Sequence, residues 1–79
     1  MPCFHLNLIG ADVVRDEEGH ELADLDTAIA IAIAGARELI ADLVVSGKTA
    51  DLGQRIDITD DDDVVLHTVH FADVVRFVG

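Results

Sequence analysis

The chain of 79 residues has a single cysteine, Cys3, and only five basic residues against sixteen acidic ones. No disulfide can form within it, and one unpaired cysteine is typical of a reducing compartment. The formal net charge of −11 argues against recognition of nucleic acid or of an anionic membrane surface, because Lys and Arg carry phosphate recognition. We therefore expect a cytoplasmic protein that does not bind nucleic acid.

Targeting signals and long apolar runs are also absent. The opening residues MPCFHLNLIG lack the basic segment and the small-residue cleavage site of a signal peptide. The most apolar stretch, TAIAIAIAGA, covers about ten residues, whereas a membrane helix needs about twenty. We expect no membrane association, and the length fits one small domain over residues 1–79.

Catalytic motifs are missing as well. The sequence contains no Gly-x-Ser-x-Gly elbow, no phosphate-binding loop and no dinucleotide fingerprint. The side chains that could act as nucleophiles stand in no recognisable setting; they are Cys3, Thr27, Ser46, Thr49, Thr59 and Thr68. A domain of this size has little volume for a ligand pocket of several hundred Å³. We therefore predict that the protein is not an enzyme, and we expect no cofactor.

Alternation of apolar and polar residues in CFHLNLI predicts a half-buried first strand whose apolar face consists of Phe4, Leu6 and Leu8. A turn at residues 10–12 would let residues 13–15 pair back as a short second strand. The tetrapeptide DEEG at residues 16–19 then fits a type I turn, and HELADLD leads into a helix.

The helix is the clearest element. Asp24 is the expected N-cap, and Gly47 in SGK fits the left-handed residue that ends a helix. From Leu25 onward, apolar residues at helical spacing form one broad face that should pack on a sheet: Ala28, Ile29, Ala32, Ile33, Ala36, Leu39, Ile40 and Leu43.

Two apolar runs, QRIDITD and VVLHTVHF, are separated by consecutive aspartates and predict a β-hairpin. Residues 60–63 fit an exposed hairpin tip, because aspartate hydrogen-bonds its own turn and tolerates left-handed geometry. The order strand–strand–helix–strand–strand predicts a two-layer α+β domain, with one helix packed on a small antiparallel sheet. We expect the first and last strands at its centre. The ending ADVVRFVG either extends the last strand or forms a terminal turn.

The chain also resembles a family of short, stand-alone bacterial domains of unknown function. Their pattern runs F-H-L, then D-E-x-G-x-E-L-x-D-L-x-x-A, then R-E-L, and corresponds here to residues 4–6, 16–28 and 37–39. The resemblance covers nearly the whole chain. It implies a small α+β domain and brings no activity, ligand or site.

The acidic stretch DITDDDDVVLHTVHF does not match a calcium loop of the EF-hand type, because Asp62 stands at the sixth position from Asp57 and Thr68 at the twelfth. His67 and His70, three residues apart on a strand, should point to opposite faces. His5 could approach one of them if the first and last strands were neighbours. A cation- or small-ligand-binding domain that uses His5, His67 or His70 with nearby acids stays open as an alternative.

The leading hypothesis concerns the side of the helix away from the sheet. Ile31 falls far from the apolar stripe, beside Glu38 and Asp42, and a single sheet can cover only one side of a helix. We expect a candidate interaction surface formed by Ala30, Ile31, Ala34 and Val45. The sequence thus favours an acidic, non-enzymatic interaction domain that forms a homodimer or binds a protein partner, with an open sheet edge as a second docking route.

Overall fold

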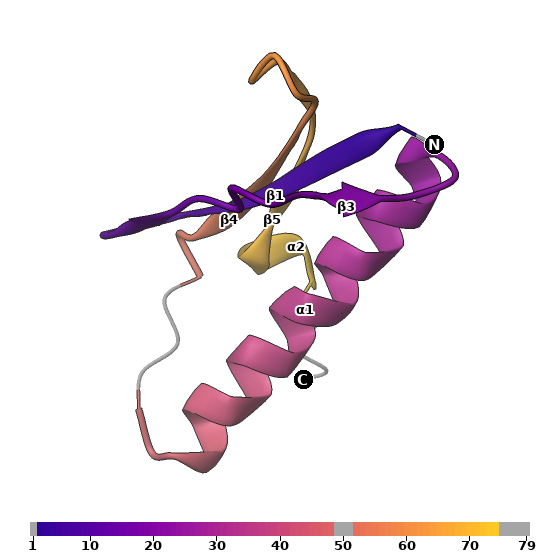
Figure 1. The fold of residues 1–79 in the computed structure, drawn as a ribbon. Coiled ribbons are helices and arrows are strands. Elements are labelled where there is room, and N and C mark those ends of the chain that lie inside the picture. The colour runs from indigo at the N-terminus through magenta and orange to yellow at the C-terminus, as the bar shows by residue number, and fades with distance from the viewer. Residues whose placement is uncertain (1, 49–51, 75–79) are drawn as a thin grey trace.

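The computed structural model describes residues 2–48 and 52–74, and Figure 1 shows a sheet lying over one long helix. These described residues contain seven elements: β1 (Cys3–Ile9), β2 (Val13–Val14), β3 (His20–Glu21), α1 (Leu25–Val45), β4 (Arg55–Thr59), β5 (Val65–His70) and α2 (Phe71–Val74). The predicted α+β class, with one helix packed on a small antiparallel sheet, is confirmed. Within the described ranges, no helix has both the length and the apolar character that a membrane crossing requires.

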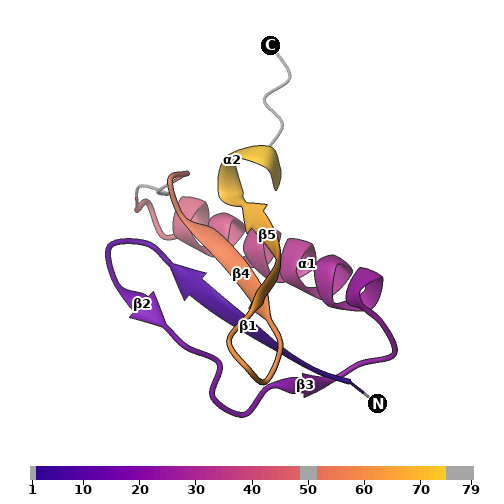
Figure 2. The same cartoon turned by 90° about the horizontal axis from the view of Figure 1, so that it is seen from above.

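The strands run in the order β2-β1-β4-β5, with every pairing antiparallel, as Figure 2 shows. The expectation that the last strand lies at the centre is wrong, because β5 lies at the edge and β4 takes the place beside β1. The apolar content of β5 was misleading. Its first two residues, Val65 and Leu66, remain 53% and 40% exposed instead of entering the core.

The short strand β3 was not predicted, whereas the turn after β5 was one of two alternatives. His20 and Glu21 form β3, which pairs with Phe4 and Cys3 of β1. These two residues have no apolar pattern, so the sequence predicts only a segment that leads into the helix. Of the two alternatives for ADVVRFVG, a longer strand or a turn, the structure has a helical turn. This turn is α2, and Phe71 at its start is buried. Residues 75–79 of that segment lie outside the described residues.

The core packs small helix residues against large sheet residues. Three alanines of α1 at four-residue spacing, Ala28, Ala32 and Ala36, are fully buried, because i and i+4 lie on the same helix face. The sheet supplies the buried Phe4, Ile58 and Val69. Alanine lets the helix approach the sheet closely, so the bulk of the core comes from the strands.

The predicted helix ends are confirmed. The Asp24 carboxylate accepts a hydrogen bond from the Thr27 backbone N–H at 2.8 Å, and the hydroxyl and N–H of Thr27 together lower the pKa of Asp24. At the other end Gly47 has a φ of 74°, and its N–H donates to the carbonyl of Val44. The helix begins and ends where local chemistry predicts.

The aspartate run forms the predicted exposed hairpin tip between β4 and β5. The Asp60 carboxylate accepts from the backbone N–H groups of Asp62 and Val64, at 2.8 Å and 3.0 Å. Asp63 has a φ of 63°, and it is the one non-glycine residue of the described chain in the left-handed region.

Candidate functional site

His5 is the point where three distant segments meet. Its Nδ1 lies 2.6 Å from the backbone carbonyl of Asp16, and its Nε2 lies 2.8 Å from a carboxylate oxygen of Asp61 at the hairpin tip. Since a carbonyl oxygen can only accept, Nδ1 carries a proton and Nε2 faces the carboxylate. The side chain of His5 is 17% exposed, whereas that of Asp61 is 72% exposed.

Asp16 fixes this geometry by fastening its turn along β1. Its backbone N–H donates to the Asn7 side-chain oxygen at 2.8 Å, and its carboxylate accepts from the backbone N–H of Leu6 at 3.2 Å. The same carboxylate accepts from the N–H of Gly19 at 3.1 Å and lies 3.2 Å from Nε2 of His20. These other hydrogen bonds of Asp16 therefore hold its backbone carbonyl in place beside His5.

Gly19 leaves room for the side chains of Cys3 and His5. Its φ is 74°, and a Cβ placed there would lie 2.5 Å from Sγ of Cys3 and 2.9 Å from Cε1 of His5. Real Cβ atoms do not approach so closely, so only glycine fits at this point of the turn.

The half-buried Cys3 completes the group, with its Sγ 3.9 Å from Nε2 of His5. One ligand atom from each of Cys3, His5 and Asp61 lies within 4.8 Å of the other two. We call this group the Cys3–His5–Asp61 cluster. Over the described part of the chain, no other set of three His, Cys, Asp or Glu side chains converges in this way.

The electrostatics of the cluster do not favour a nucleophilic thiol. Burial raises the pKa of the Cys3 thiol, and the negative charges of Asp61, Glu21 and Asp16 raise it further, whereas reactive cysteines have a lowered pKa. Cys3 and Asp61 also face the same ring nitrogen, unlike a catalytic triad, which uses the two nitrogens separately. The arrangement brings potential ligands together without activating a nucleophile.

Hydrogen bonding ties the protonation of the other two groups together. The hydrogen bond to Asp61, and then that to the Asp16 carbonyl, raise the pKa of His5. The hydrogen bond from His5 lowers the pKa of Asp61. Protonated His5 and ionised Asp61 therefore stabilise each other.

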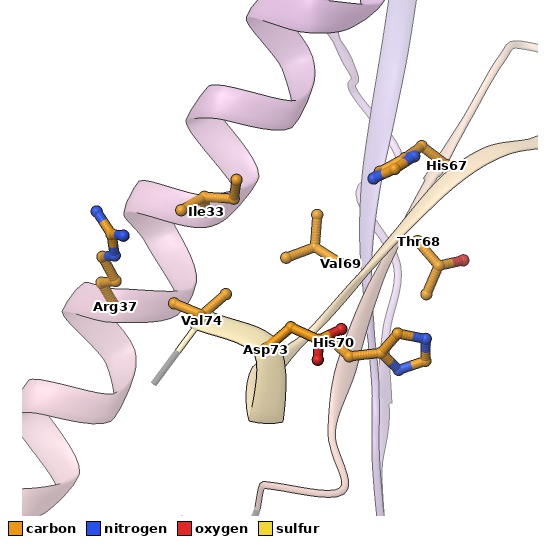
Figure 3. A pocket seen from close by; sticks show the side chains of 8 residues that line it. All are labelled: Ile33, Arg37, His67, Thr68, Val69, His70, Asp73 and Val74. Carbon is orange, nitrogen blue, oxygen red and sulfur yellow. The ribbon is translucent and has the colours of Figure 1, made fainter. Parts of the chain in front are cut away.

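The other two candidate histidines do not join this site. Figure 3 shows His67 and His70 on opposite sides of β5, as their spacing predicted. β4 lies between β1 and β5, so the two strands are not neighbours, and the condition for His5 to approach either histidine is not met. The acid that His5 does contact, Asp61, comes from the tip of the hairpin.

A pocket of about 280 Å³ lies between α1, β5 and α2 (Figure 3). Ile33 of α1 and Val69 of β5 point into it from opposite sides. Its lining also includes Arg37, His67, Thr68, His70, Asp73 and Val74. The volume falls just below the range of about 300–1,000 Å³ typical of small-molecule sites.

The candidate interaction surface on the helix is exposed as expected. Ile31 is 39% and Val45 88% exposed; Ala30 and Ala34 are also exposed, beside Ile31. Gly35 adds open space, since a Cβ built there meets no heavy atom within 4 Å. We call Ala30, Ile31, Ala34 and Val45 the outer helix face.

The Cys3–His5–Asp61 cluster was missed in the sequence. Cys3 and His5 are two residues apart on a predicted strand and thus share a face, which was the available signal. Asp61, however, is 56 residues from His5, and it joins the cluster only because β4 pairs with β1.

The protein is thus a two-layer α+β domain with the Cys3–His5–Asp61 cluster at the start of β1. Its sequence matches the model of a domain of unknown function (DUF6894) over residues 3–72. The chain belongs to this family, which confirms the resemblance drawn from its F-H-L and D-E-x-G-x-E-L motifs. No curated protein and no solved structure matches the chain.

Proposed function

We propose that this chain is a cytoplasmic, non-enzymatic interaction domain that forms a homodimer through the outer helix face. The carrying observation is that α1 is apolar on both sides while the sheet covers only one. All its buried residues, Ala28, Ala32 and Ala36, belong to the covered side. A helix with apolar residues nearly all round is normally covered on both sides.

The chemistry of the outer helix face suits another helix. Ala30 and Ala34, with Gly35 beside them, would let a second backbone approach closely, and Ile31 protrudes from this low surface. The distance between packed helix axes depends on the side chains at the contact, and small residues shorten it. A second copy of α1 supplies the same surface, so a two-fold axis would bring the two faces together.

The charge and the site chemistry support the remaining parts of the proposal. A net charge of −11 disfavours phosphate-bearing partners and anionic membranes. The single cysteine fits a reducing compartment, and the raised pKa of Cys3 disfavours nucleophilic catalysis.

The dependence of association on salt concentration distinguishes a homodimer from a complex with a basic partner. Two chains of charge −11 repel each other, and added salt screens this repulsion. We therefore expect self-association to strengthen between about 50 mM and 500 mM sodium chloride, since the Debye length falls below 10 Å over this range. Binding to a basic partner would weaken instead.

The deciding experiment measures mass by sedimentation or light scattering for two matched variants. Ile31→Glu places a charge on the outer helix face, and Leu66→Glu does the same on the edge strand β5, at almost equal exposure, 39% against 40%. The proposal expects a dimeric wild type, a monomeric Ile31→Glu and a dimeric Leu66→Glu. A monomeric wild type, or a dimeric Ile31→Glu, contradicts it; loss of the dimer in Leu66→Glu alone assigns the contact to the sheet edge.

A further inference from the structure

We propose that the Cys3–His5–Asp61 cluster binds one thiophilic divalent cation of the Zn²⁺ class per chain. The inference is independent of dimerisation, because the cluster lies at the start of β1 and at the hairpin tip, not on the outer helix face. It replaces the broader cation-binding alternative with three named ligand atoms: Sγ of Cys3, Nε2 of His5 and a carboxylate oxygen of Asp61.

The ligand types select the cation. A thiolate and an imidazole favour zinc and similar metals, whereas calcium and magnesium prefer sites made of oxygen ligands. Three protein ligands, with water in the fourth position, make a tetrahedral zinc site of the open kind.

Two of the three distances between ligand atoms lie within about 0.6 Å of those of such a site. Tetrahedral zinc with ordinary bond lengths separates a sulfur from a nitrogen ligand by about 3.6 Å and a nitrogen from an oxygen ligand by about 3.4 Å. The cluster has 3.9 Å between Sγ and Nε2 and 2.8 Å between Nε2 and the Asp61 oxygen. The carboxylate must withdraw by roughly 0.6 Å, and its side chain is free to do so because it is 72% exposed.

His5 already has the orientation of a metal ligand. Its Nδ1–H donates to the Asp16 carbonyl at 2.6 Å, so in the neutral imidazole the lone pair is on Nε2, the atom that faces Cys3 and Asp61. Histidine ligands to metals usually donate their other ring N–H to a carbonyl or carboxylate, which fixes ring and tautomer. The turn that carries this carbonyl is itself fastened to Leu6 and Asn7 of β1.

The charge around the cluster favours a cation and disfavours the thiolate alone. Burial and the nearby acids keep the Cys3 thiol protonated, and a divalent cation reverses this preference because metal-bound thiols are deprotonated. Binding therefore releases the Cys3 proton to water, together with one proton from each His5 that is charged at the start. The bond between cation and sulfur forms as the S–H bond breaks, with no change of oxidation state.

Cobalt(II) is a direct probe, because Cys3 is the only cysteine of the chain. A thiolate-to-cobalt charge-transfer band in the near ultraviolet would then report the bond to Cys3 alone. We expect this band to appear at one equivalent of Co²⁺ per chain, and Zn²⁺ to displace it. Magnesium and calcium at the same concentrations should leave the spectrum unchanged.

Four variants, each checked for folding by circular dichroism, test the ligand set. Cys3→Ser should abolish the band. His5→Gln and Asp61→Asn should weaken Zn²⁺ binding by about 100-fold or more, since losing even an outer-shell partner costs about 10–100-fold. The double variant His67→Gln/His70→Gln removes two histidines outside the cluster and should bind as the wild type does.

The result that overturns the proposal is also defined. Absence of the cobalt band in the wild type, or Zn²⁺ affinity unchanged in Cys3→Ser or Asp61→Asn, leaves no intrachain site at this cluster. One metal per two chains with a band present would place Cys3 in a site between molecules, and this outcome too contradicts the proposal.

Discussion

Two turns with the same design meet at His5, and one uses a glycine where the other uses an aspartate. Each turn, residues 16–19 and residues 60–63, begins with an aspartate whose carboxylate accepts from nearby backbone N–H groups: that of Gly19 for Asp16, and those of Asp62 and of Val64, just after the turn, for Asp60. In each, the fourth residue is left-handed: Gly19 at 74° and Asp63 at 63°.

The difference lies in what surrounds the fourth residue. Gly19 faces the side chains of Cys3 and His5 at distances that exclude a Cβ, whereas Asp63 is exposed and pairs with Arg15 at 2.8 Å. Backbone conformation alone therefore does not require glycine in this fold. Glycine is required where a turn lies against β1, and aspartate suffices where the turn projects into solvent.

The largest expected effect comes from exchanging the two residues. Gly19→Asp should cost about 2–3 kcal/mol of unfolding free energy, as overpacking does, although aspartate tolerates this φ at position 63. Asp63→Gly should change stability by no more than about 0.5 kcal/mol, because two opposing effects nearly cancel. Glycine relieves the left-handed conformation, but it also makes the unfolded chain more flexible and removes a weak exposed ion pair. Urea denaturation of both variants gives the two values; a cost of no more than about 0.5 kcal/mol for Gly19→Asp would mean that the approach to Cys3 and His5 does not require glycine.

A smaller difference in stability is expected when the first aspartate of each turn is replaced by alanine. Asp16→Ala should cost about 1–3 kcal/mol, because the N–H groups of Leu6 and Gly19 lose a half-buried acceptor. Asp60→Ala should cost about 0.5–1 kcal/mol, because water can replace its carboxylate at the exposed tip. Urea denaturation again measures both, and a larger cost for Asp60→Ala would reverse the ranking of the two turns.

The smallest effect concerns the hydrogen bond between His5 and Asp61, which we call the link between the two turns, and this effect depends on pH. The raised pKa of His5 gives stability that is complete below its ordinary value of 6.5 and is lost as pH rises through the higher folded value. The lowered pKa of Asp61 gives stability that is present above 3.8 and is lost as pH falls through the lower folded value.

We therefore expect the link to be complete between pH 3.8 and 6.5. In chelator, the difference in melting temperature between wild type and Asp61→Asn should shrink by about 2–4 °C as pH rises from 6 to about 9. Asp62→Asn, a neighbouring exposed aspartate, is the matched control and should show no such trend. An NMR titration midpoint for His5 at or below 6.5 in the wild type would contradict the link.

Local chemistry could be predicted from the sequence wherever a single segment decides it. Asp24 caps α1, Gly47 ends it, and residues 60–63 form the hairpin tip, because each depends on bonds to residues a few positions away. Strand order could not be predicted in this way. Apolar content placed the last strand at the centre, but the pairing of β1 with β4 leaves β5 at the edge.

The candidate site was predicted only in part, for the same reason. The alternation in β1 places Cys3 and His5 on one face, and a possible role for His5 with nearby acids was anticipated. The identity of the acid was not, because Asp61 reaches His5 only through the pairing of β1 with β4. Strand β3 was missed because its two residues, His20 and Glu21, have no apolar signal.

The placement of β1 also has a consequence for how the chain folds. Its partner β4 is about fifty residues away, as in the pairing of Leu6 with Ile58, whereas the β1–β2 and β4–β5 hairpins need only short loops. Closing a long loop costs entropy before its contacts form. The two hairpins and α1 are therefore expected to form early and reversibly, and the docking of β1 on β4 to limit the folding rate.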